Sequence, residues 1–166
     1  MSDKNLNVIS KKDAYMLIAK LIAKRSKDPN TQVGAVIVSD KDRILSLGYN
    51  GFPNGCSDDE FPWAREAASE YDTKYPYVIH AELNAILNFF GDNHNLVGSS
   101  LYVTLFPCRE CAKAIIQSGI ACIYYEDNKY KDTLDHKESC RMLEAAGVRC
   151  IQYSPSVDSF KTLFGS

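Results

Sequence analysis

The sequence lacks a long hydrophobic segment and a strong charge of either sign. Its longest apolar stretches, such as the one around Val36-Ile37-Val38, are far shorter than the roughly 20 residues of a membrane-spanning helix. Its first residues are polar and precede no apolar signal-peptide core, so we expect a cytoplasmic protein with no membrane partner. The formal net charge is −2, from 19 Lys and Arg against 21 Asp and Glu. Because proteins that coat nucleic acid are usually strongly basic, we also expect no nucleic-acid partner.

Tryptophan and histidine are scarce, and cysteine is only moderately frequent. The 166 residues include one Trp, three His and six Cys, and they contain no internal repeat or low-complexity tract. In a reducing compartment, we expect the six cysteines to be free thiols or metal ligands rather than partners in disulfides. The 45% apolar and 24% charged residues are those of an ordinary globular protein. At about 150 residues per domain, we expect a single domain over residues 1–166.

The apolar pattern predicts alternating helices and strands. Ser10, three residues before Asp13, indicates the start of a first helix, and Asp28-Pro29-Asn30 indicates its end. Strands are expected over 33–38, 44–49, 101–105, 120–125 and 148–153, and further helices near 81–89, over 108–117 and 138–146, with a short one over 63–68. Two hairpin strands followed by alternating helices and strands predict an α/β fold, with helices packed on the faces of a mixed sheet.

Two short segments carry residues suited to metal chemistry, His80-Ala81-Glu82 and Pro107-Cys108-Arg109-Glu110-Cys111. Each lies where a predicted helix begins. Cys108 and Cys111 are three residues apart, so their sulfurs point the same way on a first helical turn. Two thiolates and one imidazole form a zinc site with one position open, and they favour zinc over calcium or magnesium. Together the segments match the H-x-E and P-C-x-x-C pattern of zinc deaminases.

Glu82 is the expected proton-transfer group. Zinc held by two thiolates and a neutral His80 has a formal charge of zero, so we expect it to acidify a bound water less than a three-histidine site does. A neighbouring base is then needed, and Glu82 lies two residues from His80. The fitting reaction is hydrolytic: water adds to an amidine-like carbon, Glu82 passes a proton to the leaving group, and ammonia departs. Backbone amides around Ala81, at a helix start, would help to orient a substrate carbonyl.

Two other interpretations remain open from the residues alone. A structural zinc module would need a fourth protein ligand. The candidates for this ligand, none of which has an informative spacing, are His94, His136, Cys140 and Cys150. A deaminase acting on an unpaired base in tRNA or single-stranded DNA would use the same zinc chemistry. The slightly negative net charge disfavours this second alternative.

Beyond the zinc segments, the sequence resembles the deoxycytidylate (dCMP) deaminase family, within the zinc-dependent cytidine and deoxycytidylate deaminases. The resemblance runs from about Ser10 to Cys150 and is carried by residues 25–35, 48–56, 72–77, 80–86, 105–113 and 127–130. It implies a cytidine-deaminase-like three-layer α/β/α sandwich with a central mixed five-stranded sheet. It also implies hydrolysis of dCMP to dUMP and ammonia, which supplies dUMP for dTMP synthesis. In this family His80, Cys108 and Cys111 would bind the catalytic Zn²⁺, and Glu82 would shuttle protons.

The resemblance also suggests substrate-binding residues. Asn50 matches an asparagine that contacts the sugar, and Tyr130 matches a substrate-binding position. Arg25 and Ser26 are expected partners of the 5′-phosphate, because arginine binds phosphate through charge-assisted and often bidentate hydrogen bonds. The alternative for this pair is a solvated helix end, where cations are also favoured.

Regulation and assembly are implied by the resemblance alone. Members of the family are commonly activated by dCTP with Mg²⁺ and inhibited by dTTP. Gly51, Phe52, Asn54 and Gly55 lie in a loop that resembles the segment tied to this regulation, where glycines would let backbone amides approach a triphosphate. The same residues would equally form an ordinary turn. The family also implies a homo-oligomer, with a homohexamer as the expected form.

Overall fold

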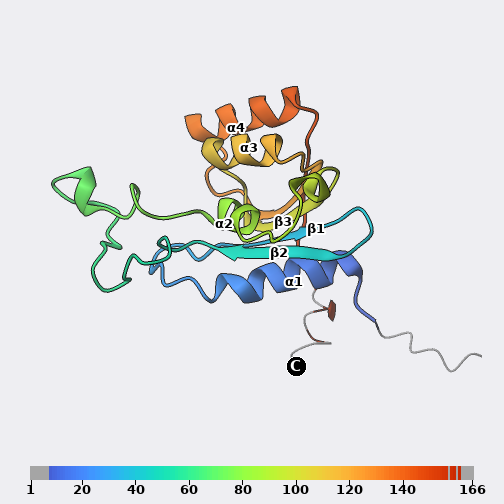
Figure 1. Ribbon diagram of the computed structural model, residues 1–166, viewed down its shortest axis with the longest axis horizontal. Helices are drawn as coiled ribbons and strands as arrows, with labels where there is room; N and C mark the ends of the chain where they lie inside the picture. Colours follow the sequence, from blue (N-terminus) through green and yellow to red (C-terminus); the bar gives the residue numbers. More distant parts are fainter. Residues whose placement is uncertain (1–7, 157, 160, 162–166) are drawn as a thin grey trace, which may run out of the picture.

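A mixed five-stranded sheet lies between two layers of helices in the computed structural model, which describes residues 8–156, 158–159 and 161 (Figure 1). The strands are β1 (Gly34–Val38), β2 (Ile44–Tyr49), β3 (Ser100–Leu105), β4 (Cys122–Asp127) and β5 (Arg149–Gln152), in the order β2-β1-β3-β4-β5. Strand β1 is antiparallel to β2 and β3, whereas β3, β4 and β5 run parallel. The mixed sheet expected from the sequence is therefore confirmed.

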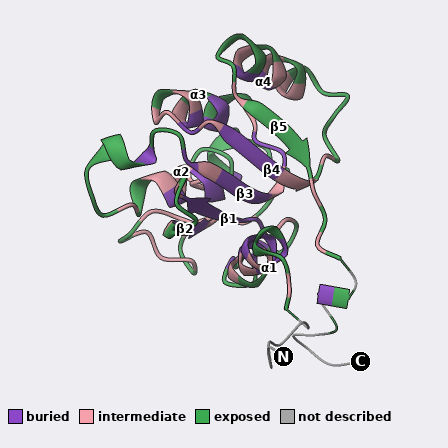
Figure 2. Ribbon diagram, turned by 90° about the vertical axis from the view of Figure 1, so that its right-hand side faces the viewer, coloured by how far each residue is buried: buried purple, intermediate pink, exposed green. Residues whose placement is uncertain are grey.

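Helices cover both faces of the sheet (Figure 1). They are α1 (Lys11–Ala23) on the first face, and α2 (Ala81–Leu87), α3 (Arg109–Gln117) and α4 (Leu134–Ala145) on the second. The fully buried β1 separates two cores: Val36 packs with the α1 side, and Ile37 with the side of α2 and α3. Figure 2 shows the buried central strands and the exposed edge strand β5. The three-layer α/β/α sandwich is confirmed.

The first helix begins as the sequence predicts, but its acidic residue has a different partner. The Ser10 hydroxyl accepts a hydrogen bond from the Asp13 amide at 3.0 Å. The buried Asp13 carboxylate accepts hydrogen bonds from Tyr153 at 2.6 Å, from Ser159 at 2.5 Å and from Ser156. Burial acts to raise the pKa of Asp13, but these hydrogen bonds outweigh it and lower the pKa overall. Asp13 thereby fastens the segment after β5 to the start of α1.

The segment between β2 and α2 differs from the prediction. The short helix expected over 63–68 is wrong, and the one helical turn described there is the 3₁₀ turn Glu70–Asp72. The segment extends away from the sheet in Figure 1. Its aromatic rings pack on one another, with 4.2 Å between the ring centroids of Phe52 and Trp63 and 5.6 Å between those of Phe52 and Phe61. These contacts between residues distant in sequence take the place of helical periodicity.

Most remaining boundaries lie close to those predicted, but α1 ends at Ala23, before the Asp28-Pro29-Asn30 stretch that was expected to end it. Helix α4 begins at Leu134, four residues before the expected start at 138, because the Thr133 hydroxyl caps it by accepting a hydrogen bond from the His136 amide at 3.2 Å. In the part of the chain that is described, no helix has both the length and the apolar character needed to span a membrane.

Two glycines let helices lie directly against the sheet. A Cβ atom on Gly34 would lie 2.0 Å from the carbonyl oxygen of Ala19 in α1. On the opposite face, a Cβ atom on Gly48 would lie 2.3 Å from the carbonyl oxygen of Ala81 and 2.3 Å from the amide nitrogen of Ala85. Because Gly48 places no side chain between β2 and α2 at this position, the backbone of α2 can approach the strand directly there.

We expect Gly48→Ala to lower the free energy of unfolding by about 1–3 kcal/mol, because the new methyl group overlaps the backbone of α2. Urea denaturation followed by circular dichroism measures this loss. Leu47→Ala, next to it on β2 and partly exposed, is the control and should change stability less. A Gly48→Ala variant as stable as the wild type would contradict the close approach.

Candidate metal centre and active site

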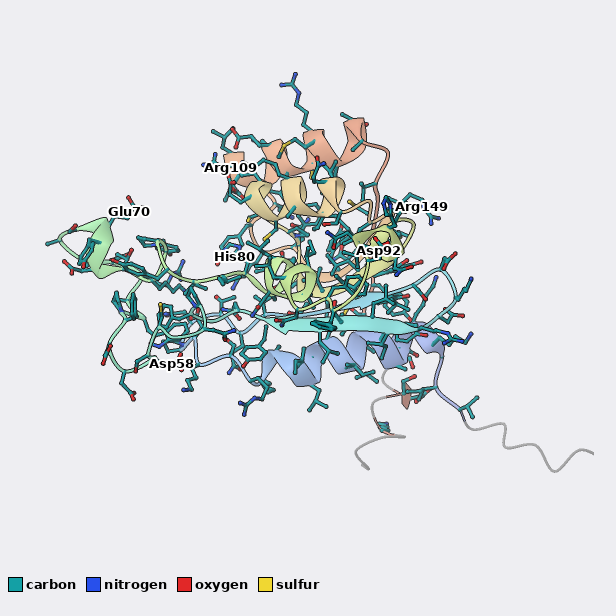
Figure 3. The ribbon with its side chains drawn as sticks, viewed as in Figure 1. Asp58, Glu70, His80, Asp92, Arg109 and Arg149 are labelled. Carbon is teal, nitrogen blue, oxygen red and sulfur yellow. The ribbon has the colours of Figure 1, made fainter. Side chains whose placement is uncertain are left out.

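Three potential metal ligands meet where two helices begin. His80 is the N-cap residue of α2, Cys108 is the N-cap residue of α3, and Cys111 lies in the first turn of α3. The His80 Nδ1 atom lies 3.3 Å from the Cys108 Sγ atom and 3.5 Å from the Cys111 Sγ atom. Figure 3 shows His80 and Arg109, the residue after Cys108, at the same end of α2 and α3.

The spacing and chemistry of these atoms fit zinc. With Zn–N and Zn–S bonds of about 2.0 and 2.3 Å, a tetrahedral site separates nitrogen from sulfur by about 3.5 Å. The three ligand atoms all lie within 4.8 Å of one another, and no fourth His, Cys, Asp or Glu among the described residues joins them. His80 and Cys108 also line a cavity, so an open coordination position would face it. This arrangement is typical of a catalytic zinc site rather than a structural one.

The side chains of His80, Cys108 and Cys111 interact closely enough to shift one another's pKa. Hydrogen bonds with Cys111 and His80 lower the pKa of the Cys108 thiol, against the effect of its partial burial. The hydrogen bond to Cys108 raises the pKa of His80 to about 9, although burial opposes this change. Without a metal ion, the Cys108 thiolate and the His80 imidazolium form a neutral pair, and a bound metal ion would take the place of the imidazolium proton.

Glu82 lies beside the ligands without joining them. Its side chain is 4% exposed and lines the same cavity. Burial raises the pKa of Glu82 to about 7, although the charge on His80 opposes this shift. A carboxyl group that titrates near neutral pH can both accept and donate a proton, which is the property required of a general acid–base group.

The cavity has a volume of about 660 Å³, which is within the range of small-molecule sites. Four parts of the chain form its wall: the loop after α1, the segment between β2 and α2, the turn between β3 and α3, and the loop between β4 and α4. Ala81 and Tyr130, expected from the sequence to contact substrate, both line it. His136 also lines the cavity but stays outside the group of metal ligands.

Asn50 lines the cavity as well, but most of its amide group is already engaged. Its Oδ1 atom accepts a hydrogen bond from the Val33 amide at 2.8 Å. Its Nδ2 atom donates to the Thr31 carbonyl at 2.9 Å and to Asp28 Oδ2 at 3.3 Å. A second lone pair on Oδ1 is the hydrogen-bonding capacity left for a ligand. Asn50 therefore holds the loop after α1 in place, a role that its sequence position did not suggest.

A buried ion pair between Asp28 and Lys74 is a second feature that sequence reasoning missed. Asp28 is 3% and Lys74 7% exposed, and the Lys74 ammonium group donates a hydrogen bond to Asp28 Oδ2. The Oδ1 atom of Asp28 accepts from the amides of Asn30 and Thr31 at 2.8 and 3.1 Å. Burial acts to raise the pKa of Asp28, but the hydrogen bonds from Lys74 and these amides lower it overall. The only sequence signal was that both residues lie in segments carrying the family resemblance.

Arg25 and Ser26, expected to bind phosphate, do not line the cavity. Ser26 is buried, and its hydroxyl accepts a hydrogen bond from the Asp28 amide at 3.3 Å. The Lys and Arg residues that line the cavity, among those the structure describes, are instead Arg65, Lys74 and Arg109. No sequence pattern selects Arg65, because its place in the cavity wall depends on how the segment between β2 and α2 packs.

The four loop residues expected to bind an effector also lie outside the cavity. Gly51 forms backbone hydrogen bonds with Ile79 in both directions, Phe52 packs on Trp63, and Asn54 and Gly55 are exposed. Gly55 has a φ angle of +90°, which favours glycine. The effector role of the loop stays a prediction.

Comparison with known proteins is consistent with this geometry. Residues 9–127 match the family described as the cytidine and deoxycytidylate deaminase zinc-binding region. The chain is 50% identical to human deoxycytidylate deaminase over 153 residues, which cover 92% of this chain and 84% of the human one. It is 37% identical to the deoxycytidylate deaminase of Enterobacteria phage T4 over 159 residues, covering 72% and 81% of the two chains.

A solved structure shares the fold. The dCMP deaminase of cyanophage S-TIM5, crystallised in complex with dCMP and dUMP, is 32% identical with a TM-score of 0.68. The match covers 86% of this chain and 96% of that one.

We expect Cys108→Ser to weaken zinc binding by more than about 10-fold, because a hydroxyl group is a poor substitute for a thiolate ligand. Zinc content after dialysis and competition with a chromogenic chelator measure this change. Cys150→Ser, on the exposed strand β5, is the matched control and should retain zinc. Equal zinc loss in both variants would argue for a different ligand set.

We expect Lys74→Ala to lower the free energy of unfolding by about 3–5 kcal/mol at pH 7, because it leaves the Asp28 carboxylate buried without its cation. The folded-state pKa of Asp28 is lowered, so its contribution to stability is present above its unfolded pKa and is lost as the pH falls through the folded value. The difference between variant and wild type should therefore shrink in acid. Urea denaturation from pH 7 to pH 3 measures this trend.

The matched control for Lys74→Ala is Lys27→Ala, which breaks the exposed ion pair with Asp58 and should change stability little. A similar small effect for both lysines would show that the buried pair does not stabilise the fold.

Proposed function

Because the chain belongs to the family of cytidine and deoxycytidylate deaminases, we propose that it catalyses the hydrolysis of dCMP to dUMP and ammonia. The observation that carries the proposal is the buried Glu82 beside a His80, Cys108 and Cys111 group in one cavity. Relatives of this chain named deoxycytidylate deaminases support the choice of substrate, as does the S-TIM5 enzyme crystallised with dCMP and dUMP.

His80, Cys108 and Cys111 would hold the zinc ion, and Glu82 would move the protons. A bound zinc ion would lower the pKa of a water molecule at its open coordination position. The Glu82 carboxylate accepts a proton from the attacking water and, once protonated, donates one toward the departing amino group. Water contributes the oxygen that replaces this group on the pyrimidine ring, and ammonia leaves. Because the pKa of Glu82 is about 7, the residue changes protonation state easily at neutral pH.

The proposal extends to regulation, assembly and metabolic role. The loop holding Gly51, Phe52, Asn54 and Gly55 would bind dCTP with Mg²⁺ as an activator and dTTP as an inhibitor. Its support is the resemblance of this segment to the regulatory loop of the family and its position outside the cavity. The enzyme would act as a cytoplasmic homohexamer and supply dUMP for dTMP synthesis.

The experiment that tests the function is ammonia release by zinc-loaded protein. dCMP is compared with deoxycytidine, dCTP and a cytosine-containing oligonucleotide, each with and without a low concentration of dCTP and Mg²⁺. We expect turnover of dCMP, enhanced by dCTP. Turnover unaffected by dCTP would remove the regulatory part alone, whereas turnover of the oligonucleotide but not of dCMP would overturn the proposed substrate.

We expect Glu82→Ala to retain zinc and the fold but to reduce kcat by about 10²–10⁴-fold, because general acid–base catalysis contributes this much. Zinc content and thermal unfolding are measured on the same sample. Retained turnover would exclude Glu82 as the proton shuttle, and lost zinc would show that it supports the metal site instead.

A further inference from the structure

Among the described residues, three Lys and Arg side chains line the cavity, and carboxylates compensate two of them. Lys74 pairs with the buried Asp28. Arg109 lies within ion-pair distance of three carboxylates, at 2.7 Å from Glu138, 3.5 Å from Asp135 and 3.7 Å from Glu110. Arg65 forms no ion pair with any described residue. Its guanidinium group donates a hydrogen bond to the Tyr75 hydroxyl at 3.3 Å. Among the cavity-lining Lys and Arg residues, Arg65 is therefore the one whose positive charge is available to pair with a negatively charged ligand.

The backbone keeps Arg65 beside Tyr75. The Lys74 amide donates a hydrogen bond to the Ala64 carbonyl at 2.9 Å, which joins the two parts of the segment that carry these side chains. Trp63, two residues before Arg65, is packed on Phe52. The guanidinium group thus projects from an anchored part of the wall, although the side chains of Arg65 and Tyr75 are themselves exposed.

Tyr130 adds a second phenol to this part of the cavity. It lines the cavity from the loop between β4 and α4. The pKa of Arg65 is raised, first by the hydrogen bond that Arg65 donates to Tyr75 and then by the electrostatic effects of the Tyr75 and Tyr130 phenols. One guanidinium group and two phenols provide several hydrogen-bond donors around a single positive charge. A phosphate group needs this combination, because it carries negative charge and several acceptor oxygens.

We propose that Arg65, with the Tyr75 hydroxyl, binds the 5′-phosphate of the substrate and makes the enzyme select a nucleotide over a nucleoside. This inference rests on the proposed function and specifies how the same cavity recognises its substrate. It moves the phosphate contact from Arg25 and Ser26, which do not line the cavity, to the segment between β2 and α2.

The test compares kcat/KM for dCMP and deoxycytidine in zinc-loaded wild type, Arg65→Ala, Arg65→Lys and Tyr75→Phe. We expect Arg65→Ala to lower kcat/KM for dCMP by about 100-fold, mainly through KM, and to leave deoxycytidine unchanged. Arg65→Lys should recover part of the loss because it keeps the charge but not the bidentate geometry. Tyr75→Phe should lower kcat/KM several-fold for dCMP and leave kcat/KM for deoxycytidine unchanged. Arg43→Ala, an exposed arginine in the hairpin between β1 and β2, is the matched control.

Equal losses on both substrates in Arg65→Ala would overturn the inference, because they would indicate a role in folding or in the chemistry. A selective loss on dCMP in Arg25→Ala, with Arg65→Ala unaffected, would restore the contact expected from the sequence. Calorimetric binding of dUMP against deoxyuridine gives a readout that does not depend on turnover. If the wild type turns over neither substrate, the proposed function fails, and the dUMP preference of wild type against Arg65→Ala still decides the role of Arg65.

Discussion

The active site depends on two helices that begin at the same point. His80 and Cys108 are N-cap residues, so each occupies an extended position immediately before a helix whose first amide groups point toward it. An N-cap residue cannot shift without shifting its helix, and α2 is held on β2 by the close approach at Gly48 and by a hydrogen bond of 2.7 Å from the Ser46 hydroxyl to the Ala85 carbonyl. The geometry of the metal ligands is therefore a property of the helix–sheet packing, and the local sequence alone does not produce it.

The opposite wall of the cavity depends on a different kind of interaction. Asp28 receives hydrogen bonds from Lys74, Asn50 and two backbone amides, so one buried carboxylate joins the loop after α1, the end of β2 and the segment before α2. Replacement of such a buried pair by apolar groups is often neutral, whereas loss of one partner is costly. The main effect of the Asp28–Lys74 pair is thus to determine where three segments meet, and its contribution to the net free energy of unfolding is secondary.

The sequence predicted the features that short local patterns carry. The candidate metal ligands and Glu82 were identified because they lie in short motifs at helix starts, although their approach in space depends on the packing of α2 and α3, and most strands follow from apolar runs bounded by turns. It failed where distant residues decide the outcome: the expected helix over 63–68 is absent, and Trp63 packs on Phe52 there instead. No periodicity shows which arginine reaches the cavity, so the sequence alone does not select Arg65, which lines it. The support that the Asn50 amide gives to the neighbouring loop has no sequence signal either, and its contact with a ligand stays a prediction.

The hydrogen bonds to Asp13 have a consequence for how the chain tolerates cleavage after β5. Tyr153, Ser156 and Ser159 donate to a carboxylate at the start of α1, the one described helix that covers its face of the sheet. Proteolysis after Gln152 would remove these donors, and water would have to replace them around the Asp13 carboxylate. None of the described residues that line the cavity lies in the removed segment, so such a cut would loosen the attachment to α1 and leave the cavity wall intact.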